Sequence, residues 1–239
     1  MPPTIFPTGV TIYDPRKAYN CFVSYDGRNG HAYLIDMNGN ETKVWPFSAM
    51  PAEMIDPALN DGKRGHVILQ KERHNFFNET LVELNWDENV VWQWGEEAPG
   101  GAVKQSHDVA RLPNGNTLVL SRLPHRVPSI SDDPIMDQAF YEVTTDGEIA
   151  WQWLSSDHID EFGLSREQRK LLLSNRMRPR RTGLLALNNM SPLGTNKWFD
   201  SGDKRFHPDN IMTCSRDGNF VAIISKSNGE VVWQSSEWQ

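Results

Sequence analysis

The stretch "EVTTDGEIAWQW", from Glu142 to Trp153, decides the fold because three other stretches of the chain share its pattern. Each has an apolar strand, a polar turn that contains Asn, Asp or Gly, and a second strand that closes on Trp. The other copies are "LIDMNGNETKVW" with Trp45, "ELNWDENVVWQW" with Trp92 and "IISKSNGEVVWQ" with Trp233. The pattern predicts four β-hairpins in one repeated structure.

The residue in the turn sets the register of this repeat. Glu88, Gly147 and Gly229 each stand four positions before a Trp, whereas Gly39 stands six positions before Trp45, so the first copy has the looser pattern. Four hairpins with a recurrent Trp are typical of a β-propeller, whose blades are small twisted antiparallel sheets. The alternative is a β-sandwich in which the tryptophans coincide by chance. We predict an all-β chain of about four propeller blades.

Long spacings between the later copies predict an insertion at about residues 155–205. The stretch "SSDHIDEFGLSREQRKLLLSN", residues 155–175, predicts a helix. Ser165 and Gln168 resemble a capping box, and Leu171–Leu173 supply an apolar face. We therefore expect one helical insertion in an otherwise all-β chain.

The charge of the chain limits its partners. The formal net charge is −7 and the pI is near 5.5, whereas nucleic acid or an anionic membrane requires a concentrated basic surface. We therefore expect neither as a partner. Arginines do crowd between Arg176 and Arg181. They form either a solvated loop or a basic rim that attracts anions above a pocket.

The chain carries no signal for a membrane, for secretion or for a cofactor. No apolar run approaches the roughly 18 residues of a membrane helix, and the first residues lack the regions of a signal peptide. We expect a soluble cytoplasmic protein, or a periplasmic or secreted one if a signal has been removed. No phosphate loop, dinucleotide fingerprint, zinc-protease or serine-hydrolase motif is present. We predict no cofactor and no metal, since no ligand spacing supports a metal site on histidines and acids.

Polar residues bracket a predicted hairpin, "QSHDVARLPNGNTLVLSR". Its Asn-Gly pair is a strong turn signal. The hairpin itself does not need His107 and Asp108 at one end or Arg122 at the other. His125 follows in a Pro-bounded loop that can reach the same place. These side chains are either ordinary solvated ends or members of a site.

A second histidine stands in a comparable place. His207 opens "HPDNIMTCSRDGNF", and the strand after it ends in Ser215-Arg216, as the first hairpin ends in Ser121-Arg122. Loops at one mouth of a propeller converge on its channel, so these residues can meet. His and Arg together suit a tetrahedral oxyanion, because Arg presents a fork of donors and His can donate, accept or attack.

At these residues the chain resembles the arylsulfotransferase family, the PAPS-independent aryl-sulfate sulfotransferases. The resembling stretches are "GVTIYDPRKAYNCFVSY", "AYLIDMNGNETKVW", "SHDVARLPNGNTLVLSR" and "HPDNIMTCSRDGNFVAIISKSNGEVVW". The resemblance implies a six-bladed propeller in whose channel a nucleophilic histidine takes the sulfuryl group from a phenolic sulfate ester and passes it to another phenol. It also implies two further histidines, an asparagine and an arginine that hold the sulfuryl oxygens.

The resemblance assigns roles to residues of this chain. His107 and His207 match the supporting histidines, and Arg216 matches the arginine. Asn210 or Asp209 stands near the place of the asparagine. Asp209 departs from the family pattern, and a carboxylate there would repel a sulfate. Either Asn210 substitutes for it or the substrate differs.

The resemblance also implies blades beyond the four that we count. Residues 1–239 would then form a single incomplete propeller, and the nucleophilic histidine would lie on a second polypeptide that carries the C-terminal half. An open propeller leaves blade edges unpaired, which favours such a partner. Self-association into a ring and a truncated chain are the alternatives.

The first functional hypothesis is an arylsulfotransferase-like transferase for aryl sulfates and phenolic substrates, with Asp108, Arg122 and His125 near the substrate. The second is a lyase, hydratase or hydrolase that uses the same groups for acid–base chemistry on an aromatic or acidic substrate. The third is a non-catalytic binding or scaffold propeller.

Overall fold

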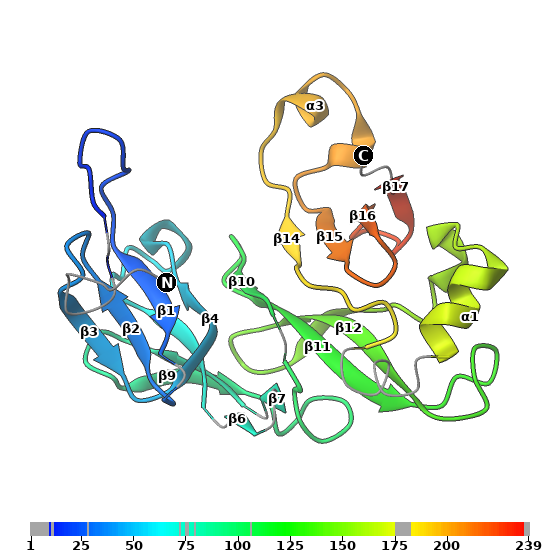
Figure 1. Ribbon diagram of the computed structural model, residues 1–239, viewed down its shortest axis with the longest axis horizontal. Coiled ribbons are helices and arrows are strands. Elements are labelled where there is room, and N and C mark those ends of the chain that lie inside the picture. Colours follow the sequence, from blue (N-terminus) through cyan, green and yellow to red (C-terminus); the bar gives the residue numbers. More distant parts are fainter. Residues whose placement is uncertain are drawn as a thin grey trace. The chain divides into compact units, whose positions relative to one another are not determined.

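The computed structural model describes residues 10, 12–27, 29–71, 73–74, 77–78, 80–105, 107–174 and 183–236. The chain divides into two compact units, Met1–Gly95 and Glu96–Gln239. Over the described ranges each unit carries two blade-sized antiparallel sheets of three or four strands (Figure 1). The prediction of an all-β fold with about four propeller blades is confirmed.

The sheets of the first unit follow one another along the chain, and each is a simple antiparallel meander. The first sheet has strands β1 (Val23–Asp26), β2 (Ala32–Ile35) and β3 (Glu41–Trp45). The second has strands β4 (Ser48–Met54), β5 (Val67–Gln70), β8 (Leu81–Leu84) and β9 (Val90–Trp94). A short 3₁₀ helix η1 (Pro57–Leu59) and a small pair, β6 (Arg73–His74) and β7 (Phe77–Asn78), lie in the connections of the second sheet.

The second unit has the same plan with longer connections. The third sheet has strands β10 (Val109–Arg111), β11 (Thr117–His125), β12 (Ile135–Val143) and β13 (Ile149–Leu154). The fourth has strands β14 (Ser191–Pro192), β15 (Ile211–Ser215), β16 (Phe220–Ile224) and β17 (Val231–Ser235). Between them lie η2 (Ile159–Phe162) and α1 (Arg166–Ser174), and the β14–β15 connection holds α3 (Lys197–Asp200) and η3 (Lys204–Phe206).

A bulge recurs at one position in all four sheets. Between the last two strands of each sheet the pairing shifts by one residue, at Leu34/Ile35, Glu83/Leu84, Glu142/Val143 and Ile223/Ile224. The turn residue that follows has a positive φ in every copy: 84° at Gly39, 67° at Glu88, 88° at Gly147 and 81° at Gly229. The repeat is therefore a backbone conformation as well as a residue pattern.

This bulge corrects the register inferred from the sequence. Trp45 faces Ala32 in the first sheet, Trp94 faces Leu81 in the second, and Trp153 faces Phe140 in the third. These three tryptophans are equivalent, and each stands six positions after its turn residue, so the interpretation of the first copy as the looser one is wrong. The fourth sheet has Ser235 at this position, opposite Val221.

Two of the equivalent tryptophans, Trp45 and Trp153, join neighbouring sheets of the same unit. Trp45 and Trp153 are at most 2% exposed. In the first unit Trp45 meets Trp86, in the β8–β9 turn, edge to face at 6.4 Å. In the second unit Trp153 Nε1 donates a 2.9 Å hydrogen bond to the carbonyl oxygen of Gly229, in the β16–β17 turn. Each such Trp buries a large apolar surface between two blades.

The predicted helix forms only in its second half. The backbone N–H of Ser165 donates to Gln168 Oε1 at 2.7 Å, and the N–H of Gln168 donates to Ser165 Oγ at 3.1 Å, which confirms the capping box. Residues 155–164 are not α-helical because Gly163 has a left-handed φ of 58° and ends η2. The basic stretch from Arg176 to Arg181 lies outside the described residues.

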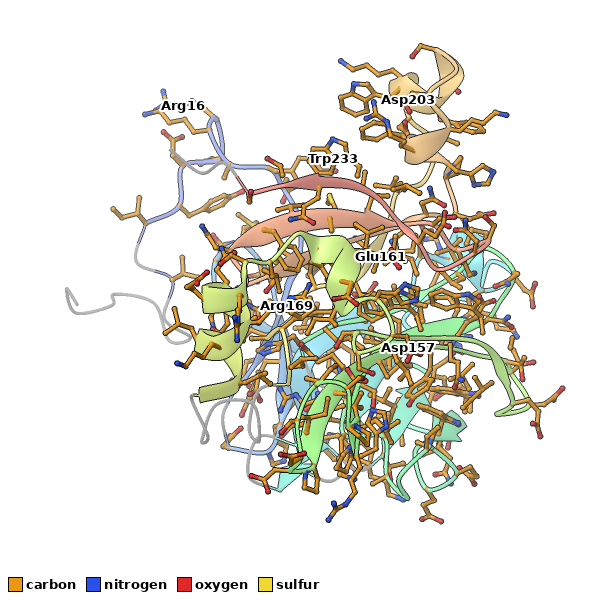
Figure 2. All side chains as sticks on the ribbon, turned by 90° about the vertical axis from the view of Figure 1, so that its right-hand side faces the viewer. Arg16, Asp157, Glu161, Arg169, Asp203 and Trp233 are labelled. Atoms are coloured by element: carbon orange, nitrogen blue, oxygen red, sulfur yellow. The ribbon has the colours of Figure 1, made fainter. Side chains whose placement is uncertain are left out.

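The η2 segment packs against the last strand of the fourth sheet (Figure 2). Val231 N–H donates to Glu161 Oε2 at 2.7 Å, and Gln234 Nε2 donates to the carbonyl oxygen of Phe162 at 3.0 Å. Phe162 also stacks on Phe220 at 4.6 Å in the core of the second unit. The insertion is thus part of this core. No helix in the described ranges has the length and apolarity to cross a membrane.

Candidate functional site

The β10–β11 hairpin has the predicted turn. Val109 faces Val119 and Arg111 faces Thr117 across the ladder. The side-chain amides of Asn114 and Asn116 both donate to Glu142 Oε1, at 2.8 and 2.6 Å. The turn is therefore anchored to β12, which fixes the far end of the hairpin and with it the position of His107 at the near end.

His107 and Asp108 stand immediately before β10, where the chain enters the third sheet. His107 has a φ of 67°, a left-handed conformation that is uncommon for residues other than glycine. Asp108 accepts from the backbone N–H of Val109 at 3.1 Å and of Met190 at 2.8 Å. The second bond ties this corner to the chain that enters the fourth sheet. Burial raises the pKa of Asp108 above its usual value.

Two arginines lie close enough to His107 to change its titration. Burial, and after it the positive charges of Arg122 and Arg216, lower the pKa of His107. Arg122 is 4% exposed, and burial together with the charge of Arg216 lowers its pKa to about 10. Arg216 is half-exposed, and its Nε donates to Asp217 Oδ1 at 2.9 Å. His107 thus lies within electrostatic range of two guanidinium groups, and a region of positive charge attracts anions.

Arg122 and Arg216 occupy equivalent positions in their sheets. Arg122 stands five residues after Thr117 in β11, and Arg216 stands five residues after Ile211, the first residue of β15. Thr117 and Ile211 both pair with the residue at the bulge, and both strands are second in their sheets. Ser121 Oγ donates to the carbonyl oxygen of Val103, and Ser215 Oγ donates to that of Leu185 at 2.5 Å. Each serine thereby fastens the incoming chain beside its arginine. The Ser-Arg similarity seen in the sequence is a structural one.

His207 does not join this group. It precedes β15, whereas Arg216 follows it, and five residues at about 3.3 Å each separate the two ends of the strand. His207 is exposed, its Nδ1 accepts from the backbone N–H of Asp209 at 3.2 Å, and its ring meets Phe199 edge to face at 4.9 Å. Asp209 is exposed as well. These residues lie at the opposite end of the fourth sheet from His107.

Asn210 has a structural role at that same end. It is buried, its Nδ2 donates to the carbonyl oxygen of Arg205 at 2.9 Å, and its Oδ1 accepts from the N–H of Lys226 at 3.3 Å. His207, Asp209 and Asn210 line a separate hollow of about 720 Å³. The predicted site residues therefore fall into two groups at the two ends of β15.

Asn188, which the sequence did not single out, lies in the stretch that leads into the fourth sheet. Leu187 pairs with Ser215 and Pro192 pairs with Ile211, so the register shifts by one residue between them and Asn188 is not in register with His107. Its N–H donates to the carbonyl oxygen of Cys214 at 3.0 Å. Its side chain makes no hydrogen bond to any residue in the described ranges. The sequence did not show that this stretch leads into the fourth sheet, because the long β14–β15 connection separates "LNNMSP" from "IMTCSR".

His125 belongs to another face of the third sheet. Its Nε2 lies 3.0 Å from Oδ2 of the fully buried Asp137. His125 stands three residues after Arg122 on β11, and side chains an odd number of positions apart point to opposite faces of a strand. His125 thus forms a pair of its own, away from the arginines.

Within the described ranges no group of three His, Cys, Asp or Glu side chains is placed to hold a metal ion. The model of the arylsulfotransferase (ASST) family matches residues 62–237. No curated protein matches the chain.

Among solved structures the chain is similar to a protein of unknown function from Bacteroides caccae, with 15% identity and a TM-score of 0.46 over 90% of this chain and 56% of that one. It is also similar to the hydrazine synthase of Kuenenia stuttgartiensis, with 12% identity and a TM-score of 0.45 over 86% and 49%. The chain thus spans about half the length of these two proteins.

Proposed function

The chain belongs to the arylsulfotransferase family, and on that premise we propose that it is part of an arylsulfotransferase-like enzyme that acts on aryl sulfates and phenolic acceptors. The observation that carries this proposal is the group of His107, Arg122 and Arg216 in the second unit. A sulfuryl group in transfer has three oxygens that carry negative charge. Two guanidinium groups beside one imidazole suit that charge distribution.

The two arginines have different roles in this proposal. Arg122 is buried, so its charge acts in a medium of low dielectric constant and is well placed to hold a sulfuryl oxygen. Arg216 is half-exposed and can reach an incoming sulfate ester. The two positive charges repel each other, and an anion bound between them relieves the repulsion.

His107 acts in this proposal as a neutral imidazole. Its lowered pKa keeps it unprotonated at neutral pH, so it can give or take a hydrogen bond at the phenolic oxygen without adding a third positive charge. Asp108 holds the backbone of this corner through its two accepted hydrogen bonds. In this proposal Asn188 adds an amide donor from the stretch that leads into the fourth sheet.

The proposal includes a second polypeptide. The family resemblance assigns the nucleophilic histidine to blades beyond those counted in this chain, so the complete enzyme would combine the group at His107 with a histidine from that partner. His207 and Asp209, at the other end of the fourth sheet, have no part in sulfuryl transfer in this scheme.

The test is sulfuryl transfer from para-nitrophenyl sulfate to phenol by the natively purified protein with any polypeptide that accompanies it. We expect release of para-nitrophenolate coupled to formation of phenyl sulfate, detected by mass spectrometry. Arg216→Gln should lower kcat/KM by about 10²- to 10³-fold because it removes a charge-assisted donor to the transferring group. Arg205→Gln is the matched control, since Arg205 is an exposed arginine paired with Asp203.

Two outcomes separate this proposal from its alternatives. Transfer that is unchanged in Arg216→Gln would contradict the assigned site. A protein that never takes up sulfate, yet loses another activity on an aromatic substrate in His107→Gln, would favour a lyase, hydratase or hydrolase with acid–base chemistry.

A further inference from the structure

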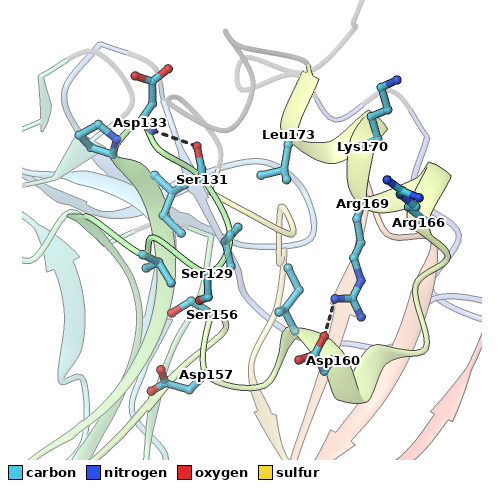
Figure 3. Close-up of a pocket in the computed structure, with 15 residues that line it drawn as sticks. Ser129, Ser131, Asp133, Ser156, Asp157, Asp160, Arg166, Arg169, Lys170 and Leu173 are labelled. Carbon is cyan, nitrogen blue, oxygen red and sulfur yellow. Dashed lines mark hydrogen bonds and ion pairs between the residues drawn. The ribbon is translucent and has the colours of Figure 1, made fainter.

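A second hollow in the second unit lies between α1 and the β11–β12 connection (Figure 3). Its volume is about 1210 Å³, which exceeds the usual range of roughly 300–1,000 Å³ for sites of small ligands. None of its lining residues belongs to the group at His107 or to the hollow at His207. Neither proposed chemistry therefore accounts for it.

The two walls of this hollow carry opposite charges. Arg166, Arg169 and Lys170 of α1 stand on one side in Figure 3, and Asp133 and Asp157 stand on the other. Arg169 is already neutralised, because its Nη1 bonds to Asp160. Arg166 and Lys170 make no ion pair with any described residue, so their charges remain available to a ligand.

The floor between the walls is apolar. Aliphatic side chains from the β11–β12 connection, from the start of β12, from η2 and from α1 line it, namely Val127, Ile130, Ile135, Ile159 and Leu173. Such a floor accepts a bulky apolar group, whose burial stabilises the complex.

Ser156 supplies an independent sign of a ligand. It lines the hollow, is 7% exposed, and its Oγ has no hydrogen-bond partner among the described residues. Its backbone is held rigidly, since Oδ1 of buried Asp137 accepts from Ser156 N–H at 3.1 Å and from Ser155 Oγ at 2.5 Å. Buried hydroxyl groups are normally hydrogen-bonded, so Ser156 Oγ is an unsatisfied group just beneath the surface of the hollow.

We propose that this hollow binds a short peptide that has both termini free and at least one bulky apolar side chain. The carboxylate faces Arg166 and Lys170, the ammonium group faces Asp133 and Asp157, and the apolar side chain rests on the aliphatic floor. A rotation about the Cα–Cβ bond of Ser156 brings its Oγ to a backbone group of the peptide. A simple anion would be repelled by one wall and a simple cation by the other, whereas a zwitterion is attracted by both.

The test is calorimetric titration of the natively purified protein with the tripeptide Ala-Phe-Ala in four forms: free, N-acetylated, C-amidated and blocked at both ends. We expect the free form to bind most tightly, each single block to weaken binding by about three- to tenfold, and the double block to weaken it further. The anion 3-phenylpropionate should bind more weakly than the free peptide.

Variants identify the wall that recognises each terminus. Lys170→Gln should weaken binding of the free peptide by about three- to tenfold and leave binding of the C-amidated form unchanged. Asp157→Asn should behave in the same way towards the N-acetylated form. Glu167→Gln is the control on α1, because Glu167 does not line the hollow.

The proposal is overturned if none of the peptides binds at millimolar concentration, or if all four forms bind equally. It is also overturned if 3-phenylpropionate binds as tightly as the free peptide, which would indicate an anion site. The variants concern exposed side chains, so loss of the fold does not obscure the result. Sulfuryl transfer should be unaffected by Lys170→Gln, which separates this proposal from the function proposed above.

Discussion

The third and fourth sheets are built alike and differ where function is expected. Both have a bulge between their last two strands, and both carry a Ser-Arg pair at the fifth and sixth positions counted from the start of the second strand. The chain enters the third sheet through His107, which has a positive φ of 67°, and it enters the fourth through Asn188, where the register shifts by one residue. A repeated framework therefore carries two equivalent arginines, and the chain that leads into each sheet differs.

The connections between the first two strands differ most. In the third sheet a short turn at Asn114-Gly115 joins β10 to β11, whereas in the fourth sheet α3 and η3 stand between β14 and β15. The long connection places His207 at the end of β15 that is far from Arg216. His107 and His207 stand in comparable places in the sequence, but they lie at opposite ends of their sheets.

The largest effect should come from breaking the contact between the two sheets. Trp153→Ala should lower the free energy of unfolding by about 3–5 kcal/mol, because it removes a buried aromatic ring and the hydrogen bond to Gly229. Urea denaturation measures this loss. The control is Trp151→Ala, since Trp151 is only partly buried. An equal loss in both variants would contradict the equivalence of Trp153 with Trp45 and Trp94.

Two adjacent asparagines sharpen the comparison at the entrance to the fourth sheet. Asn188→Ala should lower kcat/KM for sulfuryl transfer by about tenfold with little change in stability, because its side chain bonds to no described residue. Asn189→Ala should instead cost about 1 kcal/mol of unfolding free energy and spare activity. Its Oδ1 accepts from the N–H of Cys214 at 2.6 Å.

These two effects are read from steady-state kinetics and from urea denaturation of the same preparations. Activity lost in Asn189→Ala but retained in Asn188→Ala would contradict the role proposed for Asn188.

The smallest expected effect is the contribution of His107, in the third sheet, to the pH dependence of the free energy of unfolding. Its pKa in the folded protein is lower than the usual 6.5, so the unfolded chain binds the proton first. The contribution of neutral His107 to the free energy of unfolding is therefore present above about pH 6.5, and it is lost as the pH falls through the lower pKa of the folded protein.

His107→Gln should therefore lose less unfolding free energy than the unchanged protein between about pH 7 and pH 5. Urea denaturation at several pH values measures the difference, and His31→Gln, an exposed histidine, serves as the control. Sulfate should oppose the shift by raising the pKa of His107, which a titration of its ring protons by NMR detects. An unchanged pH profile in His107→Gln would remove His107 from the charged group.

Local features of this protein are determined by the sequence itself. The Asn-Gly turn at residues 114–115, the capping box of Ser165 and Gln168, and the recurrent strand that closes on Trp all form as predicted. Each depends on backbone conformation and hydrogen bonds between residues a few positions apart. Such neighbours meet whatever the rest of the chain does.

Only the tertiary structure decided which polar residues meet. The bulge makes Trp45 equivalent to Trp94 and Trp153, whereas the sequence has two tryptophans at the end of the second and third copies and does not show which of them matches Trp45. The group of His107, Arg122 and Arg216 depends on pairing between strands that a long insertion separates in sequence. Residues that precede a strand and residues that follow it lie at opposite ends of the sheet. The sequence alone therefore does not show at which end of a blade a given side chain lies.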